Sequence, residues 1–171
     1  MIENLLDFEI DKLTNSIENT LTGEIFETEI VRITSKEHNL IKNSAWLFDW
    51  RLEINNSERQ VFSLSTVHNS AIIQGLICVE DKKDHIFLHL LESAKFNKGK
   101  NKLYLGVAGN LVAFACKMSF EKGYDGFIAF DSKTALIKHY EQTLGATHFR
   151  GQRMFIKTYA AQILVNTYFR G

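Results

Sequence analysis

The sequence has no proline and only two cysteines among its 171 residues. Without proline, its turns must rely on glycine, asparagine and aspartate. Cys78 and Cys116 stand in apolar surroundings, and neither has a second thiol at the spacing of metal ligands. This pattern argues against a disulfide framework, a thiolate metal site and a nucleophilic cysteine. It predicts two reduced core residues.

The chain also lacks a net charge, because 20 lysines and arginines balance 20 aspartates and glutamates. No global field therefore attracts nucleic acid or an acidic membrane surface. No apolar run approaches the roughly 20 residues of a membrane span. The opening residues, MIENLLDFEID, lack the basic region and apolar core of a secretion signal. We expect a cytoplasmic protein with no nucleic-acid partner and no membrane partner.

Apolar residues make up 45% of the chain and aromatic residues 12%, which is enough for the core of one ordinary domain over residues 1–171. In the first 21 residues the apolar positions have mostly helical spacing, which predicts an N-terminal helical segment over Met1–Leu21. These positions are Ile2, Leu5, Leu6, Ile10, Leu13 and Ile17.

The rest of the chain predicts a mixed α/β fold. An antiparallel meander is expected first, with strands at Phe26–Ile33, Ala45–Ile54, Val61–Val67, Ala71–Val79 and His85–Leu91. After Gly109 the apolar period becomes helical. We expect a helix that ends at Gly123, a strand at Gly126–Phe130, a helix at Thr134–Leu144 closed by Gly145, a strand at Met154–Lys157 and a helix at Ala160–Tyr168.

The segment from Leu103 to Gly123, LYLGVAGNLVAFACKMSFEKG, joins a glycine-rich turn to an amphipathic helix. Gly106 and Gly109 permit close backbone approach, and the first N–H groups of a helix starting near Asn110 point outward with the positive end of its dipole. The turn therefore predicts an anion site that fits a pyrophosphate. The alternative is a plain strand-to-helix turn beside a solvated lysine loop.

This order of strands, glycine turn and helix, followed by a helix carrying HYEQTLGA, resembles the GNAT acyltransferases over roughly Phe62 to Phe155. The resemblance implies one mostly antiparallel sheet, splayed near the middle, with helices on both faces. It implies acetyl-CoA as co-substrate and no metal. In the motif Q/R-x-x-G-x-G/A, Gly106 and Ala108 take the small positions and Leu103 takes the Q/R place. Lysines crowd that turn and could neutralise phosphate charge instead. The implied cofactor-binding residues are Leu91, Lys102, Leu105, Gly106, Val107, Ala108, Gly109 and Asn110.

Two catalytic residues follow from the same resemblance. Tyr140 takes the place of the tyrosine that protonates the departing CoA thiolate, although its helical spacing with Leu136 and Leu144 also suits a core residue. The segment HLLESAKFN resembles the central splayed strand, and Glu92 at its end is the candidate general base. The alternative is a glutamate that is solvated or paired with lysines. Asn97 is a candidate for orienting the turn.

Two other groups of residues are candidates for function. No pair among His85, His89 and His139 has the spacing of a zinc site, so we expect no metal, although His89 and His139 could carry protons. The alternating aromatic residues from Trp46 to Trp50 could wall an acceptor pocket, but core packing is the favoured interpretation.

The sequence thus predicts direct acetyl transfer in a ternary complex to a small-molecule or peptide amine, with a homodimer through the aromatic C-terminus as a further candidate partner. A first alternative keeps the fold without the reaction, as a CoA-binding sensor or protein-interaction module. A second alternative, a dinucleotide-binding domain, is disfavoured because antiparallel strands precede the turn.

Overall fold

The computed structural model describes residues 5–12, 14 and 16–169. Its strands are β1 (Ile17–Asn19), β2 (Ile25–Phe26), β3 (Thr28–Ile33), β4 (Gln60–Thr66), β5 (Gly75–Asp81), β6 (Ile86–Ser93), β7 (Tyr104–Leu105), β8 (Ile128–Asp131), β9 (Thr147–Arg150) and β10 (Arg153–Ile156). Its α-helices in this part of the chain are α1 (Trp50–Ile54), α2 (Val107–Glu121), α3 (Ile137–Leu144) and α4 (Thr158–Tyr168). Short 3-10 helices cover His38–Leu40, Asn43–Ala45, Lys95–Asn97 and Thr134–Leu136.

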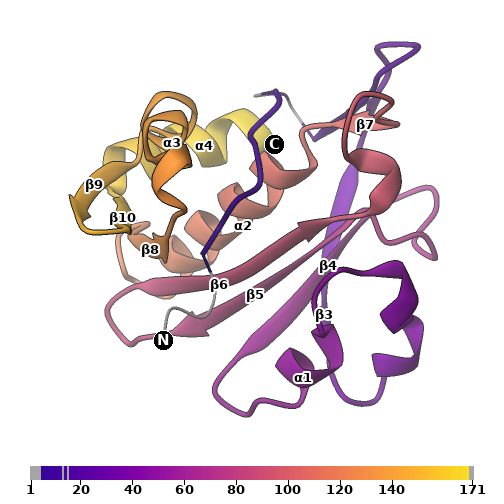
Figure 1. Cartoon of the computed structure of the whole chain (residues 1–171), viewed down its shortest axis with the longest axis horizontal. Coiled ribbons are helices and arrows are strands. Elements are labelled where there is room, and N and C mark those ends of the chain that lie inside the picture. The colour runs from indigo at the N-terminus through magenta and orange to yellow at the C-terminus, as the bar shows by residue number, and fades with distance from the viewer. Residues whose placement is uncertain (1–4, 13, 15, 170–171) are drawn as a thin grey trace.

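The main sheet has seven strands in the order β3-β4-β5-β6-β8-β10-β9, and a small sheet joins β2, β1 and β7 (Figure 1). Strands β3 to β6 form the predicted antiparallel meander. The only parallel pair of the main sheet, β6 with β8, is joined at just two positions, Ile86 with Ile128 and Phe87 with Ala129. The remainder of β6 diverges from β8, so the predicted splay near the middle of the sheet is confirmed.

Both faces of the sheet are covered, as predicted. The larger core packs α2, α3 and α4 against one face, with Leu111, Tyr140 and Leu164 among its buried residues. The smaller core lies on the other face under α1 and centres on Trp50 and Leu76. Alternate residues of β5 enter opposite cores, as the two-residue period of a strand requires. Cys78 and Cys116 are both free and buried, one in each core.

Helix α2 begins at Val107, three residues earlier than predicted, because Gly106 supplies the N-cap in a left-handed conformation with φ of 92°. The other helices and strands of this half confirm the predicted order, and Gly145 closes α3 with φ of 68°. Strand β9 was not predicted, because all four of its residues are exposed at the sheet edge and carry no apolar alternation. In the described part of the chain, no helix is long and apolar enough to cross a membrane.

The predicted strand over Ala45–Ile54 is wrong, because this stretch contains the 3-10 helix Asn43–Ala45 and the α-helix Trp50–Ile54. The Asp49 side chain caps α1 by accepting a hydrogen bond from the Leu52 N–H at 3.2 Å. Trp50 is fully buried, whereas Trp46 and Phe48 are only partly buried. The aromatic alternation therefore marks a loop and a helix start packed on the smaller core, and it is no strand face.

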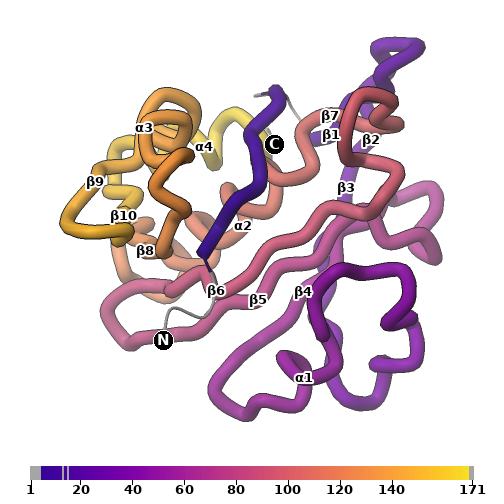
Figure 2. The backbone as a smooth tube through the Cα atoms, viewed as in Figure 1, coloured from indigo at the N-terminus to yellow at the C-terminus, as the bar shows by residue number. Residues whose placement is uncertain are grey.

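The predicted N-terminal helical segment is also wrong for the residues that the structure describes. Residues 5–12 run as an extended segment across α2, and Figures 1 and 2 show this indigo stretch passing from the β6 side toward β7. We call residues 5–12 the N-terminal strap. Ile17 then belongs to β1. Ile2 and Leu13 lie outside the described residues.

Candidate functional site

The strap lies along the open side of the splayed sheet. Leu6 forms a parallel bridge with Ser132, just beyond the end of β8. Its N–H donates to the Asp131 carbonyl at 2.7 Å, and its carbonyl accepts from the Lys133 N–H at 3.1 Å. After Phe87, β6 no longer pairs with β8. The strap therefore forms backbone hydrogen bonds on the side of the sheet where β6 has diverged.

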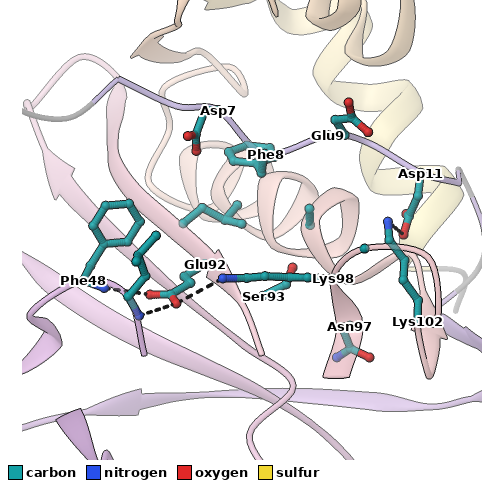
Figure 3. Close-up of a pocket in the computed structure, with 14 residues that line it drawn as sticks. Asp7, Phe8, Glu9, Asp11, Phe48, Glu92, Ser93, Asn97, Lys98 and Lys102 are labelled. Carbon is teal, nitrogen blue, oxygen red and sulfur yellow. Dashed lines mark hydrogen bonds and ion pairs between the residues drawn. The ribbon is translucent and has the colours of Figure 1, made fainter. Parts of the chain in front are cut away.

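A cavity of about 470 Å³ remains between the strap and the rest of the splay (Figure 3). Its walls are the strap, the end of β6 from Leu91 to Ser93, the loop residues Leu47 and Phe48, the Asn97–Lys102 region and Ala108. Of the predicted cofactor-binding residues, Leu91, Lys102 and Ala108 line this cavity. A space of this size suits a small-molecule arm with a few polar anchors.

The glycine turn holds an anion, and that anion is a carboxylate of the same chain. The Gly106 N–H donates to Asp11 Oδ1 at 3.0 Å, and Lys102 Nζ lies 3.0 Å from Asp11 Oδ2. The Asp11 and Lys102 side chains are 17% and 21% exposed, so the ion pair is partly shielded from water. A Cβ on Gly106 would lie 2.7 Å from Thr14 Cγ2, so the turn also needs its glycine for space. The turn therefore holds the Asp11 carboxylate, and a pyrophosphate at this turn stays a prediction.

The other predicted cofactor-binding residues point their side chains elsewhere. Leu105 pairs with Glu18 in the small sheet, and Val107 is buried in the larger core. Asn110 is fully buried; its Nδ2 lies 3.5 Å from Thr28 Oγ1, and its Oδ1 has no hydrogen-bond partner among the described residues. These residues could bind an anion only through their backbone N–H groups, because the first N–H groups of a helix have no partner within the helix. Their cofactor role stays a prediction.

The structure shows why position 109 is a glycine, which the sequence alone did not. A Cβ at this position would lie 1.9 Å from the hydroxyl oxygen of Tyr168, on the C-terminal helix α4. That hydroxyl donates to the Lys12 carbonyl of the strap at 2.8 Å. Gly109 therefore admits a side chain that holds the strap.

Tyr140 is brought to the splay and is fully buried there. Its hydroxyl donates to the Phe8 carbonyl of the strap at 2.5 Å. Its ring packs against Phe8 and Phe130, with centroids 5.4 Å and 5.5 Å away. Burial raises the pKa of this hydroxyl well above its usual range. The phenol therefore stays protonated at neutral pH and acts as a hydrogen-bond donor, and the Phe8 carbonyl of the strap accepts this bond.

Glu92 lies at the end of β6 with 3% of its surface exposed. Its carboxylate accepts from the Leu47 N–H at 2.7 Å and the Phe48 N–H at 3.2 Å (Figure 3). It also accepts from Trp50 Nε1 at 2.8 Å. Lys98 Nζ adds a contact of 3.3 Å. The four donors satisfy the carboxylate and tie the loop before α1 to the sheet. A general-base role for Glu92 stays a prediction, and the geometry gives it a structural role as well.

The remaining candidates have distinct partners. Asn97 accepts from the Tyr104 N–H at 3.0 Å and donates to the side-chain oxygen of Gln74 at 2.9 Å, so it links β7, just before the glycine turn, to the end of the β4–β5 loop; its role in orienting the turn stays a prediction. His139 Nε2 accepts from the Ile10 N–H of the strap at 2.8 Å. His89 Nε2 lies 2.7 Å from Glu80 Oε1, away from the cavity. Within residues 5–12, 14 and 16–169, no cluster of three or more His, Cys, Asp or Glu side chains is arranged to hold a metal ion.

Sequence reasoning missed the strap and with it Asp11, the residue nearest the predicted anion site. A signal was present, because Leu6, Phe8 and Ile10 alternate with Asp7, Glu9 and Asp11. This two-residue period is typical of a strand with one buried face. Leu6 and Ile10 are indeed buried, whereas Asp7, Glu9 and Asp11 lie on the exposed side.

Solved structures decide the fold family. The chain is similar to the ribosomal-protein-S18-alanine N-acetyltransferase from Escherichia coli, with a TM-score of 0.52 at 14% identity over 75% of this chain and 90% of that one. It is similar to spermidine N-acetyltransferase from Vibrio cholerae in complex with CoA and spermine, with a TM-score of 0.52 at 16% identity over 80% and 98% of the two chains. The chain has the GNAT fold. No protein-family model matches the sequence, and no curated protein matches it significantly.

The comparisons correct the predicted partners. A GNAT-fold chain from the AtaT–AtaR complex bound to DNA gives a TM-score of 0.57 at 15% identity over 80% of this chain and 98% of that one. The KacTA–DNA complex gives 0.51 at 11% identity over 81% and 98%. The predicted partner set, which excluded nucleic acid, is therefore wrong. It rested on the balanced net charge of a single chain, and net charge does not constrain an assembly in which another protein contacts the DNA.

Proposed function

We propose that this chain is an N-acetyltransferase that transfers the acetyl group of acetyl-CoA to an amine. The observation that carries the proposal is the anion held at the N-terminus of α2, where Gly106 and Lys102 bind a carboxylate. This site stands at one end of a groove that the divergence of β6 from β8 opens. The Tyr140 hydroxyl donates to the carbonyl of Phe8, a strap residue that lines the cavity. The similar structures include AtaTR bound with AcCoA, which agrees with a CoA ligand for this fold.

The residues present fit the anionic part of CoA on one condition. The Gly106 N–H and the Lys102 ammonium form a cradle that accepts a negative oxygen, as their contacts with Asp11 show. The same contacts fill the cradle, and a second anion beside Asp11 would meet like charge. The groove therefore fits CoA when the strap has left it.

In the proposed reaction, acetyl-CoA supplies a thioester carbonyl that is open to attack by a neutral amine. Transfer is direct in a ternary complex, because both cysteines are buried and lie outside the cavity lining, and the GNAT resemblance needs no covalent intermediate. As the new C–N bond forms and the C–S bond breaks, the amine nitrogen passes a proton to a base, for which Glu92 is the candidate, and the leaving sulfur takes the electron pair of the C–S bond. Tyr140 would donate its proton to that sulfur, as the GNAT resemblance implies.

Acetyl transfer is tested by following the free thiol that each turnover releases, with the full chain, acetyl-CoA and a panel of amines. A thiol signal that requires both substrates supports the proposal. Binding of acetyl-CoA by calorimetry without thiol release for any amine would contradict it.

A second candidate function is a CoA-binding sensor or protein-interaction module on the same fold. Two observations favour it. Glu92 has all its hydrogen-bonding capacity engaged by the loop and Lys98, and the exposed Leu103 stands where the resemblance expects a polar side chain. The same calorimetry separates the two candidates, because a sensor binds CoA and releases no thiol.

A further inference from the structure

We infer that the N-terminal strap is an intramolecular ligand of the cofactor groove and that it competes with CoA for the same atoms. The inference rests on the proposed function for the identity of the competing ligand. It goes beyond that function by assigning a role to residues 5–12. The groove then selects an extended peptide of alternating apolar and acidic residues, and the chain supplies such a peptide from its own N-terminus.

The N-terminal end of the strap pairs with the chain just after β8 as a parallel strand would. Leu6 exchanges two backbone hydrogen bonds with Asp131 and Lys133, and its side chain is 2% exposed in the larger core. The Asp7 carboxylate lies 2.8 Å from Lys133 Nζ on the exposed side. Addition of an extended segment beside an open strand end is a general mode of peptide recognition, in which backbone bonds give affinity and alternate side chains give specificity.

The middle of the strap is held by two side chains of α3. Tyr140 donates to the Phe8 carbonyl, and His139 accepts from the Ile10 N–H. Tyr140 is the residue proposed to protonate the leaving thiol, so this hydroxyl cannot serve the strap and the thiol at once. The strap therefore blocks the chemistry of the groove as well as its volume.

The last part of the strap imitates the charge of a phosphate. Asp11 places one carboxylate oxygen on the Gly106 N–H and the other on Lys102. A pyrophosphate at the start of α2 would use the same donors. Tyr168 fixes the next residue through the Lys12 carbonyl. From Leu6 to Lys12, the described contacts follow the groove from the end of β8 to the start of α2.

Hydrogen exchange of the full chain tests whether the strap leaves when CoA binds. The Leu6 and Ile10 amides are protected by hydrogen bonds in the closed groove, and CoA at saturation should accelerate their exchange about tenfold or more. The amide of Met154 in β10 serves as an internal control, because its strand lies away from the groove. If CoA binds and the Leu6 and Ile10 amides keep their exchange rates, the strap and CoA coexist and the inference is wrong.

Calorimetry with two charge variants tests whether Asp11 and CoA compete for the Gly106 N–H. Asp11→Asn weakens a charge-assisted hydrogen bond and removes the like charge, so we expect the affinity for CoA to rise about tenfold. Glu9→Gln is the matched control, because it removes the same charge from the strap, and no hydrogen bond or ion pair holds Glu9 among the described residues. We expect it to change the affinity less than about threefold. Equal effects of the two variants, or weaker binding by Asp11→Asn, would overturn the inference.

The two proposals fail in different ways. CoA binding that displaces the strap without thiol release leaves the inference standing and overturns the transferase function. Thiol release with an undisturbed strap supports the transferase function and overturns the inference about the strap. If neither the native chain nor Asp11→Asn binds CoA, both proposals are overturned.

Discussion

The hydroxyl of Tyr140 and the carbonyl of Phe8 are joined by a hydrogen bond of 2.5 Å across 132 sequence positions. The bond links a buried phenol of α3 to the N-terminal strap, which forms one wall of the cavity. Because burial raises the pKa of Tyr140, the hydroxyl keeps its proton at neutral pH and donates a hydrogen bond to the Phe8 carbonyl.

Replacement of this hydroxyl separates its two roles. Tyr140→Phe should lower kcat at least about tenfold, since a positioned proton donor typically contributes more than that, while KM for acetyl-CoA should fall, because the competing strap loses one of its hydrogen bonds. The unfolding free energy should fall by about 1 kcal/mol, because the Phe8 carbonyl loses its partner. Steady-state thiol release and urea denaturation measure the two effects. An unchanged kcat would remove Tyr140 from the mechanism.

Replacement of Glu92 distinguishes a structural carboxylate from a general base. Glu92→Gln presents an amide to the N–H groups of Leu47, Phe48 and Trp50, and one oxygen cannot accept from all three as the carboxylate does. We expect a loss of about 2 kcal/mol or more in urea denaturation. The exposed Glu141→Gln on α3 should stay within about 0.5 kcal/mol of the native chain. Lost turnover in a fully stable Glu92→Gln protein would instead establish the base role.

Gly109 provides a test of close packing between α2 and α4. Gly109→Ala should destabilise the chain by about 1–3 kcal/mol, although alanine favours a helix interior, because its Cβ would collide with the Tyr168 hydroxyl. In the double variant with Tyr168→Ala the collision is gone, so the two losses should fall well short of adding. Urea denaturation of the four proteins completes the cycle. Additive losses would show that the collision is not the cause.

The sequence predicted those elements whose apolar period is strong and local. Strands β4 and β6 and helix α2 are strongly apolar and mostly buried, so their patterns alone indicated the meander, the turn and the helix. The strand predicted over Ala45–Ile54 was wrong, because Trp46, Phe48 and Trp50 alternate as the residues of a strand do. A helix cap at Asp49 and a buried indole bond to Glu92 override that pattern.

The site was predictable in part for the same reason. Gly106 and its helix form a local motif, so the sequence pointed to the turn at which the structure holds a carboxylate. Asp11 fills that site from 95 positions away, and no local pattern reports such a contact. In the strap, Leu6 and Ile10 fit both a helical and an alternating pattern. Pairing with Ser132, a partner distant in sequence, decides between the two.

A comparison of two buried leucines tests whether the strap detaches as a unit. Leu6 and Leu111 are 2% and 0% exposed in the same core, so burial alone predicts similar losses of about 2–5 kcal/mol for substitution by alanine. If the strap leaves the groove without global unfolding, the loss from Leu6→Ala is limited to the free energy that docks the strap, and we expect it to be the smaller of the two. Urea denaturation measures both losses, and exchange of the Ile10 amide shows whether the strap has left in Leu6→Ala. Equal losses with a protected Ile10 amide would instead make the strap a permanent part of the core, closed to CoA in every state.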